Sequence, residues 1–216
     1  MHLSGLVIFS VALLRSVQAA SLPSGVEINA ANTSQLERRT DWWGLVRCYM
    51  GSAVLPQRGA DPELPAPVGL KVKHIALGRG TQNYTCTDDQ ATTAPVAVGA
   101  LATLYDNSCW NRAFGREQTI GSHYFVGSSP FFDFRMEGGE DFATVKGVAK
   151  VSAPDGARTN SQGAGAVDWL RLDATSGSGI KAIYRVDTAG GKPPQTCEGM
   201  APNFEVDYTA QYWAYQ

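Results

Sequence analysis

The 216-residue chain is poor in histidine and lacks the short motifs that hold metals or phosphates. Beyond His2 only His74 and His123 occur, too few for a three-histidine site, and no His-Glu-x-x-His motif exists. No Gly-x-Ser-x-Gly nucleophile motif is present. Lys192 follows a glycine but precedes a proline, which cannot supply the hydroxyl of a phosphate-binding loop. We therefore expect no metal site and no phosphate-binding loop.

A complete dinucleotide-binding fingerprint is also missing. Residues 78–83 (Gly-Arg-Gly-Thr-Gln-Asn) and 163–168 (Gly-Ala-Gly-Ala-Val-Asp) each lack the third glycine. Both run into a segment typical of a strand, whereas the fingerprint must open a helix whose N-terminus faces the pyrophosphate. We expect no nicotinamide cofactor and no other cofactor.

The chain has neither a strong charge imbalance nor a long apolar run. Its 18 basic and 20 acidic residues give a net charge of −2. A nucleic-acid binder needs a basic face that displaces counterions from phosphates. The most apolar stretch, residues 3–14, is shorter than the roughly 20 residues that cross a bilayer. We expect no nucleic-acid partner and no integral membrane segment.

That apolar stretch has the size of the central region of a secretory signal peptide. Small residues at Val17 and Ala19 match the positions that a signal peptidase reads, which predicts a signal peptide over residues 1–19. The alternative is a buried N-terminal helix or strand. The first interpretation places the protein outside the cell, free or in the cell wall.

The next segment, residues 20–40, is polar and has no periodicity, which predicts a flexible arm. It ends in Arg38-Arg39. This pair fits a dibasic processing site, which would make the arm a pro-segment, and it fits an exposed pair of arginines equally well.

The cysteines agree with export. Four are present and far apart, so no Cys-x-x-Cys metal or redox motif exists, and an even number is typical of disulfides in an oxidising compartment. The sequence leaves all three pairings open. Two glycosylation sequons predict a glycoprotein. The cysteines are Cys48, Cys86, Cys109 and Cys197, and the sequons begin at Asn32 and Asn83.

Short strand-like segments separated by glycine and proline predict a single all-β domain over residues 41–216, built as a sandwich or a barrel. Strand signals recur at intervals of roughly 8–12 residues, and no long amphipathic helix is apparent. Gly78-Arg79-Gly80 is expected to be a hairpin turn. The expected strands are residues 70–77, 81–86, 96–105 (where a helix is the alternative), 123–126, 131–136, 142–151, 167–174, 180–186 and 204–215.

Two residues form the strongest candidate for catalysis. If the segments carrying His123 and Asp133 are adjacent strands, the two side chains could share one sheet face. A carboxylate beside an imidazole orients it as a general base, which predicts an acid/base pair. The alternative is a core histidine and a surface aspartate. For a second acidic group, Glu137, Glu140 and Asp141, the neighbouring glycines favour a solvated loop over the paired carboxylates of a glycosidase.

Aromatic residues are numerous, and their flat faces can stack on sugar rings. Tyr124, Trp169 and Tyr212 are the ligand-binding candidates, with core packing as the alternative. The leading hypothesis is a non-catalytic module that binds a polysaccharide or another cell-surface component. One alternative is a hydrolase that uses His123 and Asp133. The other is a structural surface protein that assembles through its aromatic face.

Five segments follow one another in a characteristic order: residues 78–86, 121–125, 167–172, 184–191 and 208–213. Through them the chain, over about residues 65–216, resembles a family of small secreted fungal and bacterial proteins catalogued as a domain of unknown function. Its members are mostly uncharacterised, so the resemblance implies no catalytic role for any residue. Some relatives carry a malate dehydrogenase label, and the incomplete dinucleotide fingerprints argue against that activity. Related chains often have Trp and Glu where this chain has Phe131-Phe132-Asp133.

Overall fold

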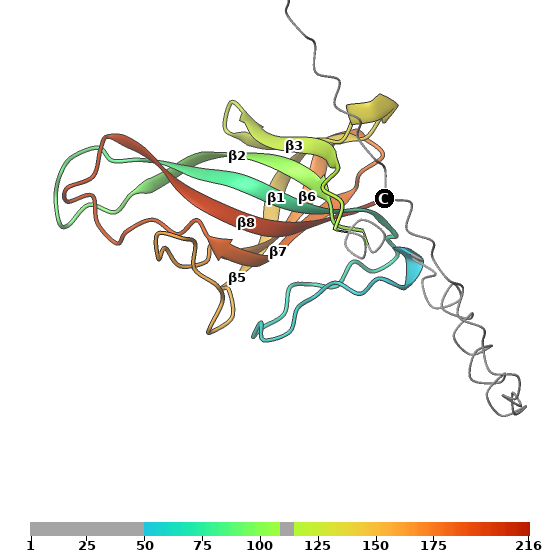
Figure 1. Ribbon diagram of the computed structural model, residues 1–216, viewed down its shortest axis with the longest axis horizontal. Coiled ribbons are helices and arrows are strands. Elements are labelled where there is room, and N and C mark those ends of the chain that lie inside the picture. Colours follow the sequence, from blue (N-terminus) through green and yellow to red (C-terminus); the bar gives the residue numbers. More distant parts are fainter. Residues whose placement is uncertain (1–49, 109–114) are drawn as a thin grey trace, which may run out of the picture. The chain divides into compact units, whose positions relative to one another are not determined.

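The computed structural model describes residues 50–108 and 115–216, which form a closed antiparallel β-barrel (Figure 1). Eight strands pair in chain order, and the last pairs with the first. The all-β, barrel-like expectation is confirmed. The strands are β1 (Val72–Thr85), β2 (Val96–Asp106), β3 (Thr119–Val126), β4 (Ser129–Asp133), β5 (Phe142–Val151), β6 (Trp169–Ser178), β7 (Ala182–Gly190) and β8 (Asn203–Tyr215), with short 3-10 turns η2 (Met50–Ser52) and η3 (Met136–Gly138).

Several expectations fall on other parts of the chain. The signal peptide over residues 1–19, the arm over residues 20–40 and the domain boundary at residue 41 lie outside the described residues, as do Asn32, Cys48 and Cys109. Asn83 lies on β1, where its Oδ1 accepts a hydrogen bond from Thr81 Oγ1 at 3.1 Å. Its glycosylation stays a prediction.

The inside of the barrel is a packed core. Side chains of a strand point alternately inward and outward, and an eight-stranded barrel is just wide enough for inward side chains to fill. Small residues such as Ala76 and Ala210 lie among large ones such as Phe132, Ile183 and Tyr212. The middle of the barrel is therefore filled by side chains.

A second core lies against the outer face of β1 and β6–β8. Trp169, Tyr184 and Trp213 point outward there and are covered by the segment that precedes β1. The Tyr184 hydroxyl donates to the Pro65 carbonyl at 2.7 Å, which helps hold that segment in place. One flank of the barrel is thus two layers thick, and its second layer is irregular chain.

The expected hairpin turn at Gly78-Arg79-Gly80 is wrong, because β1 runs without a break from Val72 to Thr85. The glycines serve packing instead. A Cβ on Gly78 would lie 2.5 Å from the Tyr212 ring, and a Cβ on Gly80 would collide with the backbone of β2. These residues allow close approach in the middle of a strand, where a local signal favours a turn.

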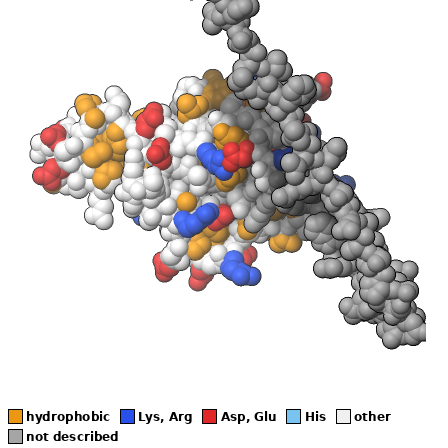
Figure 2. Space-filling model, in the orientation of Figure 1, with side chains coloured by type: hydrophobic (Ala, Val, Ile, Leu, Met, Phe, Trp, Pro, Cys, Tyr) orange, Lys and Arg blue, Asp and Glu red, His pale blue; other side chains and the backbone are white. Residues whose placement is uncertain are grey.

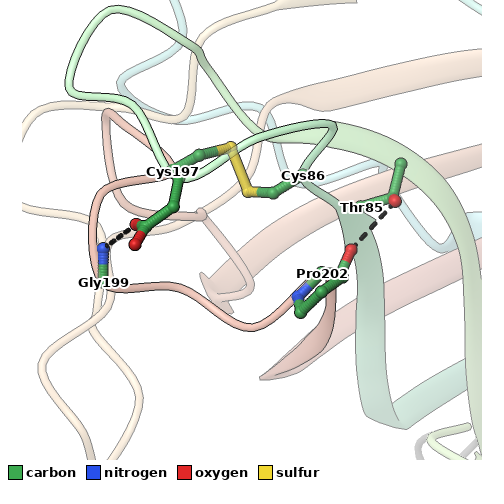
Figure 3. The surroundings of a disulfide bond; sticks show 6 residues. Thr85, Cys86, Cys197, Gly199 and Pro202 are labelled. Atoms are coloured by element: carbon green, nitrogen blue, oxygen red, sulfur yellow. Dashed lines mark hydrogen bonds between the residues drawn. A yellow bond between two sulfur atoms is a disulfide. The ribbon is translucent and has the colours of Figure 1, made fainter.

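A disulfide joins Cys86, just after β1, to Cys197 in the connection between β7 and β8 (Figure 3). Around it, Thr85 Oγ1 and the Cys86 amide both donate to the Pro202 carbonyl at 2.9 Å. The expectation of a disulfide is confirmed for this pair. The bond ties two connections together at one end of the barrel.

On the face drawn in Figure 2, basic and acidic side chains lie beside one another, with hydrophobic side chains between them.

In the part of the chain that the structure describes, no helix is long and apolar enough to cross a membrane.

Candidate functional site

His123 and Asp133 lie on opposite faces of the barrel wall, so the expectation that they share a face is wrong. The strands that carry them are neighbours, as expected, but His123 pairs with Phe132 and Asp133 pairs with Ser122. Adjacent residues of a strand point to opposite faces. His123 therefore points into the barrel and Asp133 points out of it.

Inside the barrel, His123 is 5% exposed and stacks on Phe132, with ring centroids 4.1 Å apart. Its Nδ1 donates to the Phe131 carbonyl at 2.9 Å. Burial lowers the pKa of His123 to about 4, with the Phe131 hydrogen bond opposing the shift and the positive charge of Arg185 adding to it. The imidazole is accordingly neutral at neutral pH.

On the outside, Asp133 accepts two hydrogen bonds from the Arg135 side chain, from Nε at 2.9 Å and from Nη2 at 2.6 Å, and a third from the Arg135 backbone N–H at 3.0 Å. The hydrogen bond from Arg135 holds the pKa of Asp133 below its usual value. This geometry is that of a surface ion pair, in which the Asp133 carboxylate is bound by the Arg135 guanidinium.

A histidine–aspartate contact does exist, but it joins residues that lie far apart in the sequence. His74 Nε2 lies 2.8 Å from Asp141 Oδ2, and Lys73 Nζ donates to Asp141 Oδ1 at 2.7 Å. Burial would raise the pKa of Asp141, but hydrogen bonds from Lys73 and His74 hold it below its usual value. Asp141 is therefore not the solvated loop residue that was expected. His74 and Asp141 are 67 positions apart, and no local signal pairs them.

The three ligand-binding candidates occupy three separate places. Tyr212 is fully buried inside the barrel. Tyr124 is half-buried on β3, where its ring lies 5.2 Å from that of Phe131. Trp169 lies on the outer face of β6. The structure therefore does not bring them together in one site.

Of the three, Trp169 borders a groove of about 550 Å³ on the outer face of the barrel. Trp169 and Trp213 line its inner side. Two irregular segments, which include Arg58 and Arg158, line the rest. The groove thus combines two indoles with flexible, charged side chains.

A chain of hydrogen bonds crosses this groove. Trp213 Nε1 donates to Gln211 Oε1 at 3.1 Å, and Gln211 Nε2 donates to Asp187 Oδ2 at 2.9 Å. Arg158 Nη2 lies 3.7 Å from the same carboxylate oxygen. Trp169 Nε1 is buried and has no hydrogen-bond partner among the described residues. The groove thus offers carboxylate and amide oxygens as acceptors and a guanidinium as a donor, while one indole N–H is buried and the other already donates to Gln211.

An irregularity in β7 places Asp187 in the groove. The pairing of β7 with β8 shifts between Val186 and Ala189, and Asp187 has a positive φ of 47°. The next residue, Thr188, donates to the Val167 carbonyl at 2.6 Å. Bulges of this kind redirect side chains beside functional sites, and a positive φ at a residue other than glycine is a cost that packing must offset. Nothing in the sequence around Asp187 predicted this role.

Within the described residues, no cluster of His, Cys, Asp and Glu could hold a metal ion. A family model described as "Protein of unknown function (DUF3455)" matches residues 66–216, which confirms the resemblance to a family of unknown function. No curated protein matches the chain, and no solved structure matches it. The matched region covers all eight strands and the groove residues they carry, whereas Arg58 lies before it.

Proposed function

The chain belongs to the DUF3455 family of proteins of unknown function, and we propose that it is a secreted, non-catalytic module that binds carbohydrate in the outer groove. The ligand class is a polysaccharide or a glycan of a cell wall or cell surface. The partner is bound and released unchanged.

The observation that carries this proposal is the convergence of two indoles with Asp187, Gln211 and Arg158 on one groove. A sugar ring has apolar C–H faces and hydroxyls that both donate and accept hydrogen bonds. Trp169 and Trp213 are 5% and 6% exposed, so they give the C–H faces an apolar floor with little open stacking area. The donors and acceptors of Asp187, Gln211 and Arg158 suit the sugar hydroxyls. A volume of about 550 Å³ is within the usual range of ligand pockets.

The extracellular part of the proposal is supported by other features. The apolar stretch at residues 3–14 and the small residues that follow have the pattern of a secretory signal. The disulfide between Cys86 and Cys197 suits an oxidising compartment.

Binding without catalysis is favoured by the position of the acid/base groups. Neither His123 nor His74 lines the groove, and Asp133 is held by Arg135 on another part of the barrel. Asp187 interacts with Gln211 and Arg158. A carboxylate in such contacts is suited to orienting a hydroxyl.

The test is incubation of the purified protein with a panel of insoluble wall polysaccharides. Loss of protein from solution is measured, and soluble products are sought by mass spectrometry. Asp187→Gly removes the carboxylate and is compatible with the positive φ, so this variant should fold normally and bind roughly tenfold more weakly.

Tyr124→Ala is the matched control, because it removes an aromatic ring from β3 without touching the groove. It should bind like the parent protein. Equal binding by Asp187→Gly, or release of soluble sugars by the parent protein, would contradict the proposal.

A further inference from the structure

A second cavity, independent of the outer groove, lies inside one end of the barrel. It has a volume of about 50 Å³ and is lined by residues from every strand except β5. One side is apolar and includes Ala100, Phe125 and Leu170. The other side carries Gln82, Arg185 and Tyr212. Barrels of eight strands commonly hold one small ligand in such a place.

Arg185 brings an unpaired positive charge to this cavity. Its Nε and Nη2 donate to the Asp168 carbonyl at 3.2 and 2.9 Å, and its guanidinium also interacts with the Tyr212 hydroxyl and opposes the rise that burial causes in the pKa of that tyrosine. No carboxylate of the described residues forms an ion pair with it. Arg185 is half-buried, and a partly desolvated guanidinium favours an anion beside it.

Gln82 contributes a second unused donor. Its side chain is 7% exposed and lies close enough to the Tyr208 hydroxyl to oppose the rise that burial causes in the pKa of that tyrosine, but its Nε2 makes no hydrogen bond of good geometry in residues 50–108 and 115–216. Buried amide groups in folded proteins nearly always have a partner. Gln82 reaches the cavity from β1, which only β8 separates from β7, the strand that carries Arg185.

The remaining polar groups complete a site without negative charge. The hydroxyls of Tyr208 and Tyr212 lie 2.8 Å apart, so one donates to the other and one hydrogen remains free. Burial raises the pKa of both tyrosines and keeps them neutral. His123 uses Nδ1 to donate to Phe131. His123 Nε2 and Gln82 Oε1 are acceptors, and Arg185 supplies the only formal charge among the cavity's lining residues.

We propose that this cavity binds a small monocarboxylate, with its oxygens on Arg185 and Gln82 and its carbon end against the apolar wall. A guanidinium matches the two oxygens of a carboxylate. The size of the cavity restricts the ligand to molecules near acetate and propanoate.

Acetate and propanoate are the probes, titrated into the full protein while the side-chain signals of Gln82 and Arg185 are followed by NMR. Both signals should shift with saturation, and thermal stability should rise with ligand concentration. Acetamide, which has the same shape without the charge, should do neither. Equal responses to acetamide, or no response to the carboxylates, would overturn the proposal.

Gln82→Met keeps the volume and removes an amide whose Nε2 makes no hydrogen bond, so the ligand-free variant should stay close to the parent in stability. Its affinity for acetate should fall roughly tenfold. Arg185→Met should abolish binding. The control Arg79→Met removes a positive charge from the outer surface, where Arg79 pairs with Glu117, and should leave binding unchanged.

Two further results would contradict the assignment. Unchanged acetate affinity in Gln82→Met would show that the amide is not part of the site. Stabilisation by chloride equal to that by acetate would show a general anion effect instead of carboxylate recognition. These outcomes are independent of carbohydrate binding, because the cavity and the outer groove share no lining residue.

Discussion

Among single residues, His123 shows that a histidine, a residue type capable of acid–base chemistry, can be buried as part of the core. Its ring is enclosed by Phe132 from β4 and Tyr212 from β8, and the charge of Arg185 acts on it from β7. A neutral imidazole stacked in this way is a component of the core. Its Nδ1 donates a hydrogen bond to the Phe131 carbonyl. The inner cavity that His123 borders has a volume of about 50 Å³, which leaves no room for a polymer substrate beside the imidazole.

This environment predicts a specific loss of stability in acid. Because the pKa of His123 is about 4 in the folded state and ordinary in the unfolded chain, the unfolded state takes up a proton first as pH falls. Its contribution is complete above the ordinary histidine pKa and is lost as pH falls toward the folded value, amounting to about 3 kcal/mol.

Urea unfolding at a series of pH values measures this effect. The parent protein should lose about 3 kcal/mol more than His123→Phe between neutral pH and about pH 4. Taking the difference removes the contribution of the paired carboxylates, which both proteins share. Identical pH profiles would show that the imidazole is solvated.

At the scale of elements, β1 depends on the absence of side chains at two positions. Local sequence favours a turn at Gly78-Arg79-Gly80, and pairing on both sides with β2 and β8 overrides that preference. Tyr212 from β8 packs over Gly78 inside the barrel. The strand is therefore stabilised by its neighbours more than by its own propensity.

Gly78→Ala should destabilise the protein by about 1–3 kcal/mol, because its Cβ would lie 2.5 Å from the Tyr212 ring and force that ring to move. Gly147→Ala on β5 is the matched control, since the nearest atom to its Cβ is 3.9 Å away. Chemical unfolding of both variants checks the prediction. Equal stabilities would mean that Tyr212 relocates without cost.

For the whole molecule, the disulfide is the longest-range covalent constraint that the structure describes. Cys86 and Cys197 are 111 residues apart, so the bond closes a loop of about half of the 216-residue chain in the unfolded state. Replacing both by serine should lower the free energy of unfolding by about 4–5 kcal/mol on the chain-entropy model. Urea unfolding of the variant and of the parent with intact disulfide measures the difference. A loss below ~1 kcal/mol would show that the barrel alone restrains these connections.

Barrel closure also determines which residues meet. The pairing of β1 with β8 brings the two ends of the described domain together, and the β5 region brings Asp141 to His74. The outer groove likewise combines residues before β1 with residues of β6, β7 and β8. Contacts of this range depend on the register of every intervening strand.

The sequence by itself determined the all-β class, most of the strand positions and the family, because alternation, turn residues and ordered motifs are local properties. The match is close for residues 142–151, where the expected and observed strand coincide. Only the tertiary structure decided which side chains share a face. A register that places His123 opposite Phe132 sends Asp133 outward, and one residue of slip would reverse both. Three other features have the same cause, because they follow from pairings between strands, which no short window of sequence contains. They are the bulge at Asp187, the His74–Asp141 contact and the unpaired Arg185.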